Sequence, residues 1–254
     1  MKFTILRFDE IGSTNTEALN QARRGADEGL CVVARRQTAG RGRHGRVWVS
    51  ERDAGLYFSV VLRPKIEAKF LPLITLAAAV AVHDTLEETY NLDADIKWAN
   101  DVHVGGRKIC GILAETTETN KGLAVVVGIG INLRSSNFPP EIAGLATSVE
   151  AETGRIVILD ELLEALTGFL DYHYEILLQN GGAEGIRREW TRRSSYAIGK
   201  TVRVKLENET ILGATRGIEE NGALRVETET GAIKIIQAGD VETLRMATAE
   251  KSEN

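Results

Sequence analysis

The order of hydrophobic and polar positions predicts alternating strands and helices over the first three quarters of the chain. Short apolar runs rich in β-branched and aromatic residues predict strands at Phe3–Phe8, Cys31–Ala34, Leu56–Leu62, Asp95–Trp98, Val102–Val104, Lys108–Glu115 and Leu123–Ile131. Apolar residues three or four positions apart predict helices at Ser13–Arg24, Leu71–Tyr90, Asp160–Leu178 and Glu184–Arg193. This succession predicts an α+β fold, in which a central mixed β-sheet is flanked by helices.

The pattern changes after Ser195. Short strands are expected at Thr201–Leu206, Ile211–Ile218, Leu224–Glu227 and Ile233–Gln237, and turn residues such as Asn221-Gly222 separate them. Several short strands in succession favour a small β-barrel. The sequence therefore predicts two domains, residues 1–195 and residues 196–254, the second being the small barrel with a short tail.

Composition narrows the classes of protein that fit. The chain has 254 residues, of which 43% are hydrophobic and 26% charged, and this balance is typical of a folded globular protein. A net charge of −5, with eight Lys or Arg against ten Asp or Glu from Tyr196 onward, disfavours a protein that binds nucleic acid by neutralising phosphates. The uncharged run Phe70–Val82 is shorter than the roughly 20 residues that span a bilayer, and Arg7 and Asp9 interrupt a secretory signal. We expect a cytoplasmic protein without a membrane span.

Metal-binding and redox motifs are not apparent in the sequence. Cys31 and Cys110 lie far apart in strand-like runs, so we expect buried free thiols without a chemical role. The histidines are His44, His83, His103 and His173, and their spacing fits no metal site. No protein-bound metal is expected.

Candidate chemistry concentrates between Gln37 and Trp48. From Arg35 to Arg46 there are five arginines and no acidic residue, with glycines between them. Glycines let backbone N–H groups approach an anion, and guanidinium groups bind carboxylate or phosphate with paired hydrogen bonds. The segment matches neither GxxxxGK[ST] nor a GxGxxG that opens a helix. A solvated Arg-Gly loop is the alternative, but the strands on both sides favour a ligand-binding loop.

Two further segments could contribute to the same site. A hairpin that includes Lys97-Trp98-Ala99 would bring Asn100 and Asp101 close to Lys108 and Gly111. A surface hairpin with a turn-forming Asn-Asp is an equal alternative for this segment. In the strand that follows, Gly128 and Gly130 leave one face of the sheet bare, so either a flat ligand or a closely packed helix could lie there.

Together these motifs resemble those of the biotin protein ligases, also called biotin–[acetyl-CoA-carboxylase] ligases. GRGRHGRVW, KWANDV, RKICGIL and GIGIN occur in the family's order, and the resemblance covers essentially the whole chain. It implies a catalytic sheet of the class II synthetase type, with a C-terminal barrel of the SH3 type. It also implies that biotin and ATP, with Mg²⁺, form biotinyl-5′-AMP, from which biotin passes to a lysine of a biotin carboxyl carrier protein.

The resemblance also implies roles for individual residues. Arg41 and Arg43 would hold the biotin carboxylate and the adenylate phosphate, and Lys108 would neutralise the phosphoryl centre, so these are the expected catalytic residues. The expected biotin-binding residues are Ser13, Thr14, Asn15, Gln37, Gly40, Arg41, Lys108, Gly111, Gly128 and Gly130. The expected nucleotide-binding residues are Arg43, Arg46, Trp48, Asn100, Asp101 and Asn132, and Arg245 is a weaker candidate. The loop is expected to be mobile until ligand anions neutralise its charge.

The chain departs from the family pattern in two respects. Ala99 stands where the family usually has proline, and we expect a small loss of rigidity without loss of function. Regulatory members also carry an N-terminal helix-turn-helix, whereas this sequence starts with the first catalytic strand. We therefore expect no DNA partner. A homodimer through a sheet edge is left open.

Two other functions stay open on the sequence alone. Lipoate–protein ligases use the same adenylate chemistry on a related fold, and pocket shape decides between the two acids. A non-enzymatic nucleotide- or RNA-binding module could use the arginines for phosphate contacts, although the acidic barrel disfavours it.

Overall fold

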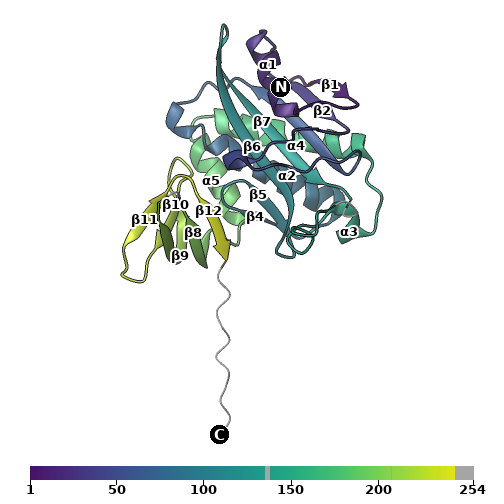
Figure 1. Ribbon diagram of the computed structural model, residues 1–254. Helices are drawn as coiled ribbons and strands as arrows, with labels where there is room; N and C mark the ends of the chain where they lie inside the picture. The colour runs from purple at the N-terminus through teal and green to yellow at the C-terminus, as the bar shows by residue number, and fades with distance from the viewer. Residues whose placement is uncertain (135–137, 207, 244–254) are drawn as a thin grey trace.

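The computed structural model describes residues 1–134, 138–206 and 208–243; Arg245 lies outside the described residues. A seven-stranded sheet forms the centre, in the order β1-β2-β3-β7-β6-β5-β4 (Figure 1). Its strands are β1 (Thr4–Phe8), β2 (Leu30–Ala34), β3 (Gly55–Leu62), β4 (Ala94–Lys97), β5 (Asp101–Val104), β6 (Arg107–Thr119) and β7 (Gly122–Asn132). β1 and β2 are parallel and the other neighbours antiparallel, which confirms the predicted mixed sheet.

Helices cover both faces of this sheet. They are α1 (Thr14–Arg23), α2 (Leu73–Tyr90), α3 (Val149–Thr153), α4 (Leu159–Leu178) and α5 (Gly182–Arg192). Successive strand residues point to opposite faces, so in β7 Val126 packs against the α1 side, while Val125 and Val127 join the larger core around α2. The loop between β2 and β3, whose Trp48 lies over Gly130 of β7, therefore shares one face with α1, and α2, α4 and α5 bury the other.

The helix α2 is the most apolar element of the chain. The helical stretch Ala68–Tyr90 is long and apolar enough by composition to cross a membrane. However, 72% of its apolar part is buried inside the protein. It lies between the sheet and the helices α4 and α5. These contacts are those of a core helix.

A second sheet is antiparallel and five-stranded, in the order β11-β10-β9-β8-β12. Its strands are β8 (Ile198–Lys205), β9 (Thr210–Ile218), β10 (Leu224–Glu227), β11 (Ile233–Ile236) and β12 (Asp240–Thr243). Figure 1 shows it beside α5 and β4, and the Trp98 indole donates a 2.9 Å hydrogen bond to the carbonyl oxygen of Gly222 across the junction. The domain boundary after residue 195 stays a prediction.

The structure adds elements that the sequence pattern did not predict. α3 has only five residues and begins at its N-cap Ser148, so it is too short to show helical periodicity. β12 has four residues and pairs with β8. Within the expected loop, Arg43–Gly45 forms a 3₁₀ turn in which His44 has a φ of 54°. The Trp98–Ala99 peptide bond is cis.

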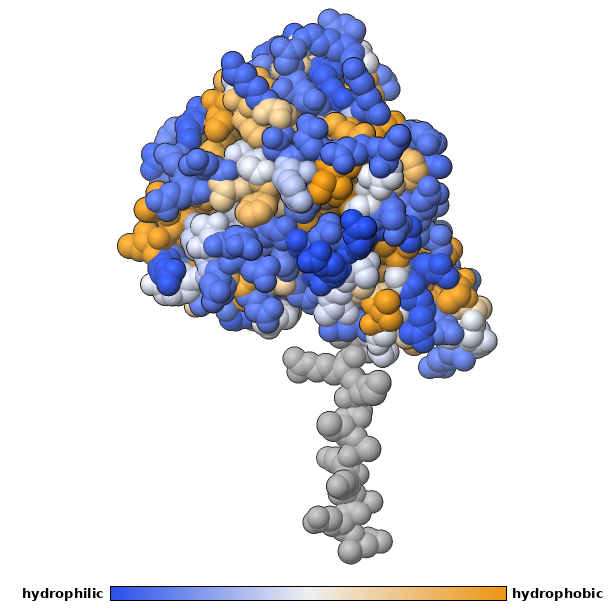
Figure 2. Space-filling model, turned by 180° about the vertical axis from the view of Figure 1, so that it is seen from behind, coloured by the Kyte–Doolittle hydropathy of each residue, from blue (hydrophilic) through white to orange (hydrophobic). Residues whose placement is uncertain are grey.

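Both cysteines are buried free thiols, as expected. Burial raises the pKa of Cys31 to about 12 and the pKa of Cys110 further. Apolar patches on the face seen in Figure 2 are separated by hydrophilic side chains.

Candidate active site

A cavity of about 430 Å³ opens on the α1 side of the sheet, between the arginine loop, the β5–β6 hairpin and β7. Its size is that of a small-molecule site. The predicted site residues that line it are Ser13, Thr14, Asn15, Gln37, Arg41, Arg43, Arg46, Trp48, Asn100, Asp101, Lys108, Gly111, Gly128, Gly130 and Asn132. Gly40 is the predicted residue that is not part of the lining. The fold therefore gathers segments that are distant in the sequence into one site.

Neutral polar side chains gather at one end of the cavity, around Gln37. Gln37 Oε1 accepts hydrogen bonds from Thr14 N at 2.8 Å and Thr14 Oγ1 at 3.1 Å, while its Nε2 donates to Ser50 Oγ at 2.8 Å. The Ser59 hydroxyl lies 2.6 Å from Asn15 Oδ1 and 2.8 Å from Thr14 Oγ1. These neutral groups are fixed by one another at the start of α1. They suit a ligand with amide-like donors and acceptors.

The space above the glycines of β6 and β7 is already occupied by protein side chains. A Cβ on Gly128 would lie 2.0 Å from Asn15 Oδ1, and one on Gly130 would lie 2.5 Å from Trp48 Cε2. A Cβ on Gly111 would likewise lie 2.9 Å from Trp48 Cζ3. The glycines therefore bring Asn15 and Trp48 close to the sheet, and these side chains in turn face the cavity.

Each loop arginine in the cavity has a different partner. Arg41 Nη2 lies 2.6 Å from Glu115 Oε1, and the other oxygen of Glu115 accepts a 3.0 Å bond from Asn15 Nδ2. Arg46 forms an ion pair with Asp240, from β12 of the second sheet.

Arg43 donates a 2.7 Å hydrogen bond to the neutral amide oxygen of Asn100, and in the described residues it forms no ion pair with a carboxylate. Its charge therefore stays available for an anionic ligand.

The hairpin places an ammonium group at the other end of the cavity. Lys108 Nζ lies 2.7 Å from Asp101 Oδ1 and 5.5 Å from the centre of the Trp48 ring. The side chains of Lys108 and Asp101 are 32% and 22% exposed, so a ligand can reach both. Asn132 Nδ2 donates to the carbonyl oxygen of Thr147 at 3.0 Å, and this bond ties β7 to the segment before α3. Lys108, Arg43 and Trp48 thus form a cationic, aromatic end.

Sequence reasoning missed three polar residues of this site. Glu115 ends the predicted strand Lys108–Glu115, where nothing singles it out, and Ser59 stands in an otherwise apolar strand. Asp240 is 194 residues away from its partner Arg46, and no local signal connects the two. Only the packing of the second sheet against the loop reveals it.

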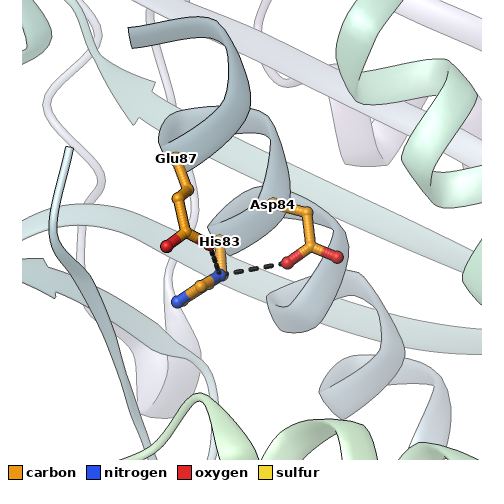
Figure 3. Close-up of side chains that lie close together, drawn as sticks. All are labelled: His83, Asp84 and Glu87. Carbon is orange, nitrogen blue, oxygen red and sulfur yellow. Dashed lines mark hydrogen bonds and ion pairs between the residues drawn. The ribbon is translucent and has the colours of Figure 1, made fainter. Parts of the chain in front are cut away.

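A cluster on α2 resembles a metal site, but other protein side chains, among them the guanidinium of Arg193, already occupy it. Ligand atoms of His83, Asp84 and Glu87 lie within 4.8 Å of one another (Figure 3). However, Arg193 Nε lies 2.5 Å from Asp84 Oδ1, and His173 Nε2 lies 2.8 Å from Asp84 Oδ2. A metal ion would have to displace the partly buried Arg193 guanidinium or lie beside it, and like charges repel.

The same contacts control the ionisation of Asp84. Burial opposes its charge, yet hydrogen bonds from His173, His83 and Arg193 outweigh that effect and hold the pKa of the carboxyl far below its usual range. The cluster joins α2 to α4 and α5 as a buried ion network.

Comparison with known proteins identifies the family. Residues 8–132 match the Biotin/lipoate A/B protein ligase family, and residues 197–244 match the Biotin protein ligase C terminal domain. The chain is 38% identical over 239 residues to the bifunctional ligase/repressor BirA of Bacillus spizizenii, covering 92% of this chain and 72% of that protein. It is 35% identical to the biotin–[acetyl-CoA-carboxylase] ligase of Paracoccus denitrificans, covering 90% of this chain and 96% of that one.

The fold leads to the same family. The biotin protein ligase of Aquifex aeolicus, solved in complex with biotin and ATP, superposes with a TM-score of 0.82 at 30% identity, over 95% of this chain and 99% of that chain. These similarities define a class of ligases that act on biotin or lipoate. Within that class, the chain belongs to the biotin protein ligase family.

Proposed function

We propose that this protein joins biotin to ATP as biotinyl-5′-AMP and then transfers biotin to a lysine of a biotin carboxyl carrier protein of an acetyl-CoA carboxylase. The observation that carries the proposal is the two-ended cavity, with neutral hydrogen-bonding groups around Gln37 at one end and Lys108 with Arg43 at the other. A ureido ring is neutral and has N–H donors and a C=O acceptor, whereas an adenylate carries charge. The two ends match the two halves of the intermediate.

The first half-reaction needs positioning and charge neutralisation rather than a base. A biotin carboxylate oxygen attacks the α-phosphorus of MgATP, a new P–O bond forms, and pyrophosphate leaves with the electrons of the broken P–O bond. Arg43 and Lys108 face the site where negative charge accumulates, so they stabilise the transition state. Trp48 lies flat against the glycines and offers its other face to adenine.

The Arg41–Glu115 ion pair supports a role for Arg41 in holding the loop over the end around Gln37 rather than in direct chemistry. Asn100 and Asp101 position Arg43 and Lys108 through the contacts described above. Mg²⁺ enters with ATP as part of the substrate. A cytoplasmic location is part of the proposal, and the free thiols Cys31 and Cys110 are consistent with a reducing compartment.

A homodimer through β6 is a further part of the proposal. β6 has 13 residues, but β5 pairs only with its Arg107–Gly111 segment, and in the described residues no strand pairs with the same edge beyond Ile112. An unpaired edge of this length can add a second strand. Sedimentation velocity over a range of protein concentrations measures whether two copies associate.

Biotin-dependent exchange of labelled pyrophosphate into ATP tests the proposed reaction. We expect exchange with biotin and none with lipoate, because a dithiolane ring offers no partner for the hydrogen-bonding groups around Gln37 and Thr14. Exchange with lipoate alone would identify a lipoate–protein ligase. No exchange with either acid would favour a non-enzymatic nucleotide-binding protein.

A further inference from the structure

A second cavity lies beside the first, toward the second sheet. It has a volume of about 190 Å³ and is bounded by the start of α2, the turn between β4 and β5, β6 and residues 221–223 of the second sheet. The residues that line both cavities are Arg43, Asn100, Ile112 and Leu113. The two cavities therefore meet at the contact between Arg43 and Asn100.

Asn100 is held in place by β6 at this junction, whereas Arg43 belongs to the arginine loop. Two hydrogen bonds join Asn100 to Ile112. The backbone N–H of Ile112 donates to the carbonyl oxygen of Asn100 at 2.9 Å, and Asn100 Nδ2 donates to the carbonyl oxygen of Ile112 at 3.1 Å. Arg43 reaches Asn100 from the loop through one 2.7 Å hydrogen bond to a neutral oxygen. A phosphate binds a guanidinium more strongly than an amide does, so a bound adenylate would draw Arg43 away from Asn100. That movement opens the junction without disturbing the sheet.

The lining of the second cavity suits an uncharged amine on an aliphatic stem. Among the described residues that line it, Arg43 carries the only charge, and the walls include Pro72, Leu76 and Trp98. Apolar walls accommodate the methylene stem of a lysine. A guanidinium at the inner end disfavours a protonated amine, and the neutral amine is the nucleophile that acyl transfer requires.

The order of the two half-reactions also calls for a separate entrance. When transfer begins, biotin and AMP already fill the first cavity, so the acceptor has to approach the acyl carbon from outside that space. The second cavity adjoins the first at Arg43, which is where the phosphate end of the intermediate is expected.

We propose that the second cavity is the entrance for the acceptor lysine of the carrier protein, an inference that rests on the proposed function. The lysine loses one proton to solvent and enters as a neutral amine. Its nitrogen attacks the acyl carbon, the bond from that carbon to the phosphate oxygen breaks, and AMP leaves with the electron pair. The new amide nitrogen releases a second proton to solvent.

Thr75→Trp tests the entrance. Thr75 lies in the first turn of α2, is half-buried, lines the second cavity and does not line the first. An indole at this position obstructs the path to the acyl carbon, so we expect transfer to a biotin carboxyl carrier domain to fall on the order of 100-fold. Pyrophosphate exchange is expected to stay at the wild-type rate.

Thr89→Trp is the matched control, because it makes the same substitution on the same helix, at a half-buried position that lines neither cavity. It should change neither rate. Cleavage of the enzyme-bound adenylate by hydroxylamine supplies a small acceptor, and Thr75→Trp should leave that cleavage unchanged because hydroxylamine needs no wide entrance.

Three results would contradict the proposal that the acceptor lysine enters through the second cavity. Carrier transfer by Thr75→Trp within twofold of the control would show that lysine enters elsewhere. Pyrophosphate exchange that falls with transfer would assign the cavity to ATP or pyrophosphate, and a fall in hydroxylamine cleavage would show a distorted first site. If the wild-type protein shows no exchange with biotin, the proposed function itself fails, and this outcome is distinct from the others.

Discussion

Replacing two glycines of β7 by alanine should impair the two ends of the cavity separately. At Gly130 the new Cβ would lie 2.5 Å from Trp48 Cε2 and 2.6 Å from Trp48 Nε1. Carbon atoms pack at about 3.5–4 Å, so the indole has to move outward by about 1 Å. The movement carries Trp48 into the space that we assign to adenine.

The expected loss follows from the value of one stacked base. Stacking of a base on an aromatic side chain contributes about 1–3 kcal/mol, which corresponds to about a 5- to 150-fold change in affinity. We expect Gly130→Ala to raise the KM for ATP within this range and to leave the KM for biotin nearly unchanged. Trp48→Ala should have a similar effect, and adding Gly130→Ala to it should cause little further loss, because both changes act through the same side chain.

Gly128→Ala is the matched control on the same face of the same strand. Its Cβ would lie 2.0 Å from Asn15 Oδ1, so Asn15 has to leave the hydroxyl of Ser59. One or two hydrogen bonds of about 1 kcal/mol each are then lost at the end of the cavity around Gln37. Because we assign this end to biotin, the KM for biotin should rise on the order of 10-fold.

Pyrophosphate exchange measured against ATP and biotin in turn gives both constants for each variant. The reasoning is refuted if both variants change the KM of the same substrate, or if Gly130→Ala changes neither. Circular dichroism before the assay establishes that both variants fold.

Three other substitutions test separate parts of the account. Glu115→Gln removes the charge that pairs with the half-exposed Arg41, an interaction of about 1 kcal/mol, so the adenylate should dissociate about 5-fold faster in a filter-binding assay. Lys108→Ala should lower pyrophosphate exchange on the order of 100- to 1,000-fold, while transfer from chemically synthesised biotinyl-5′-AMP decreases less. Asp84→Asn removes one of the two carboxylates that pair with the partly buried Arg193, while Glu189 remains, and should cost about 1.5–3 kcal/mol of unfolding free energy in urea. Because the folded pKa of Asp84 is lowered, its stabilising effect is complete above about pH 4 and is lost only as the pH falls through that low pKa.

Controls on the same elements separate these effects from general disturbance. Glu118→Gln, at an exposed position of β6, should leave adenylate release unchanged, and equal release from both glutamine variants would contradict the role of Glu115. Unchanged exchange by Lys108→Ala would remove that residue from adenylation. An unfolding free energy of Asp84→Asn within 1 kcal/mol of the wild-type value would show that the ion network is not needed for stability.

The helices and strands could be predicted where apolar residues recur at the spacing typical of a helix or a strand. Apolar runs of β-branched residues and helical spacing predicted the strands and the long helices before Ser195, because these elements bury most of their apolar side chains in the core. α3 was missed because five residues are too few to show a helical period, and β12 was missed because Val241 is the one apolar residue among its four.

The site was predicted as a set of residues but not as a set of contacts. Glycines at alternate positions of β7 revealed that something lies close to the sheet, yet not that Asn15 and Trp48 fill that space. The arginines predicted an anion site, yet the carboxylates that pair with Arg41 and Arg46 in the structure, Glu115 and Asp240, come from distant strands. Such pairings depend on tertiary packing, which local sequence does not encode.

Capture of the intermediate is the most direct test of the central claim, that this cavity makes and retains biotinyl-5′-AMP. The protein is incubated with biotin and ATP labelled at the α-phosphate, separated from free nucleotide by gel filtration, and quenched for chromatography. The account predicts that label elutes with the protein as biotinyl-5′-AMP, and that this label disappears with Arg43→Gly, whose adenylate escapes into solution. Label that elutes with the protein as unreacted ATP, or biotinyl-5′-AMP retained equally by Arg43→Gly, would contradict it.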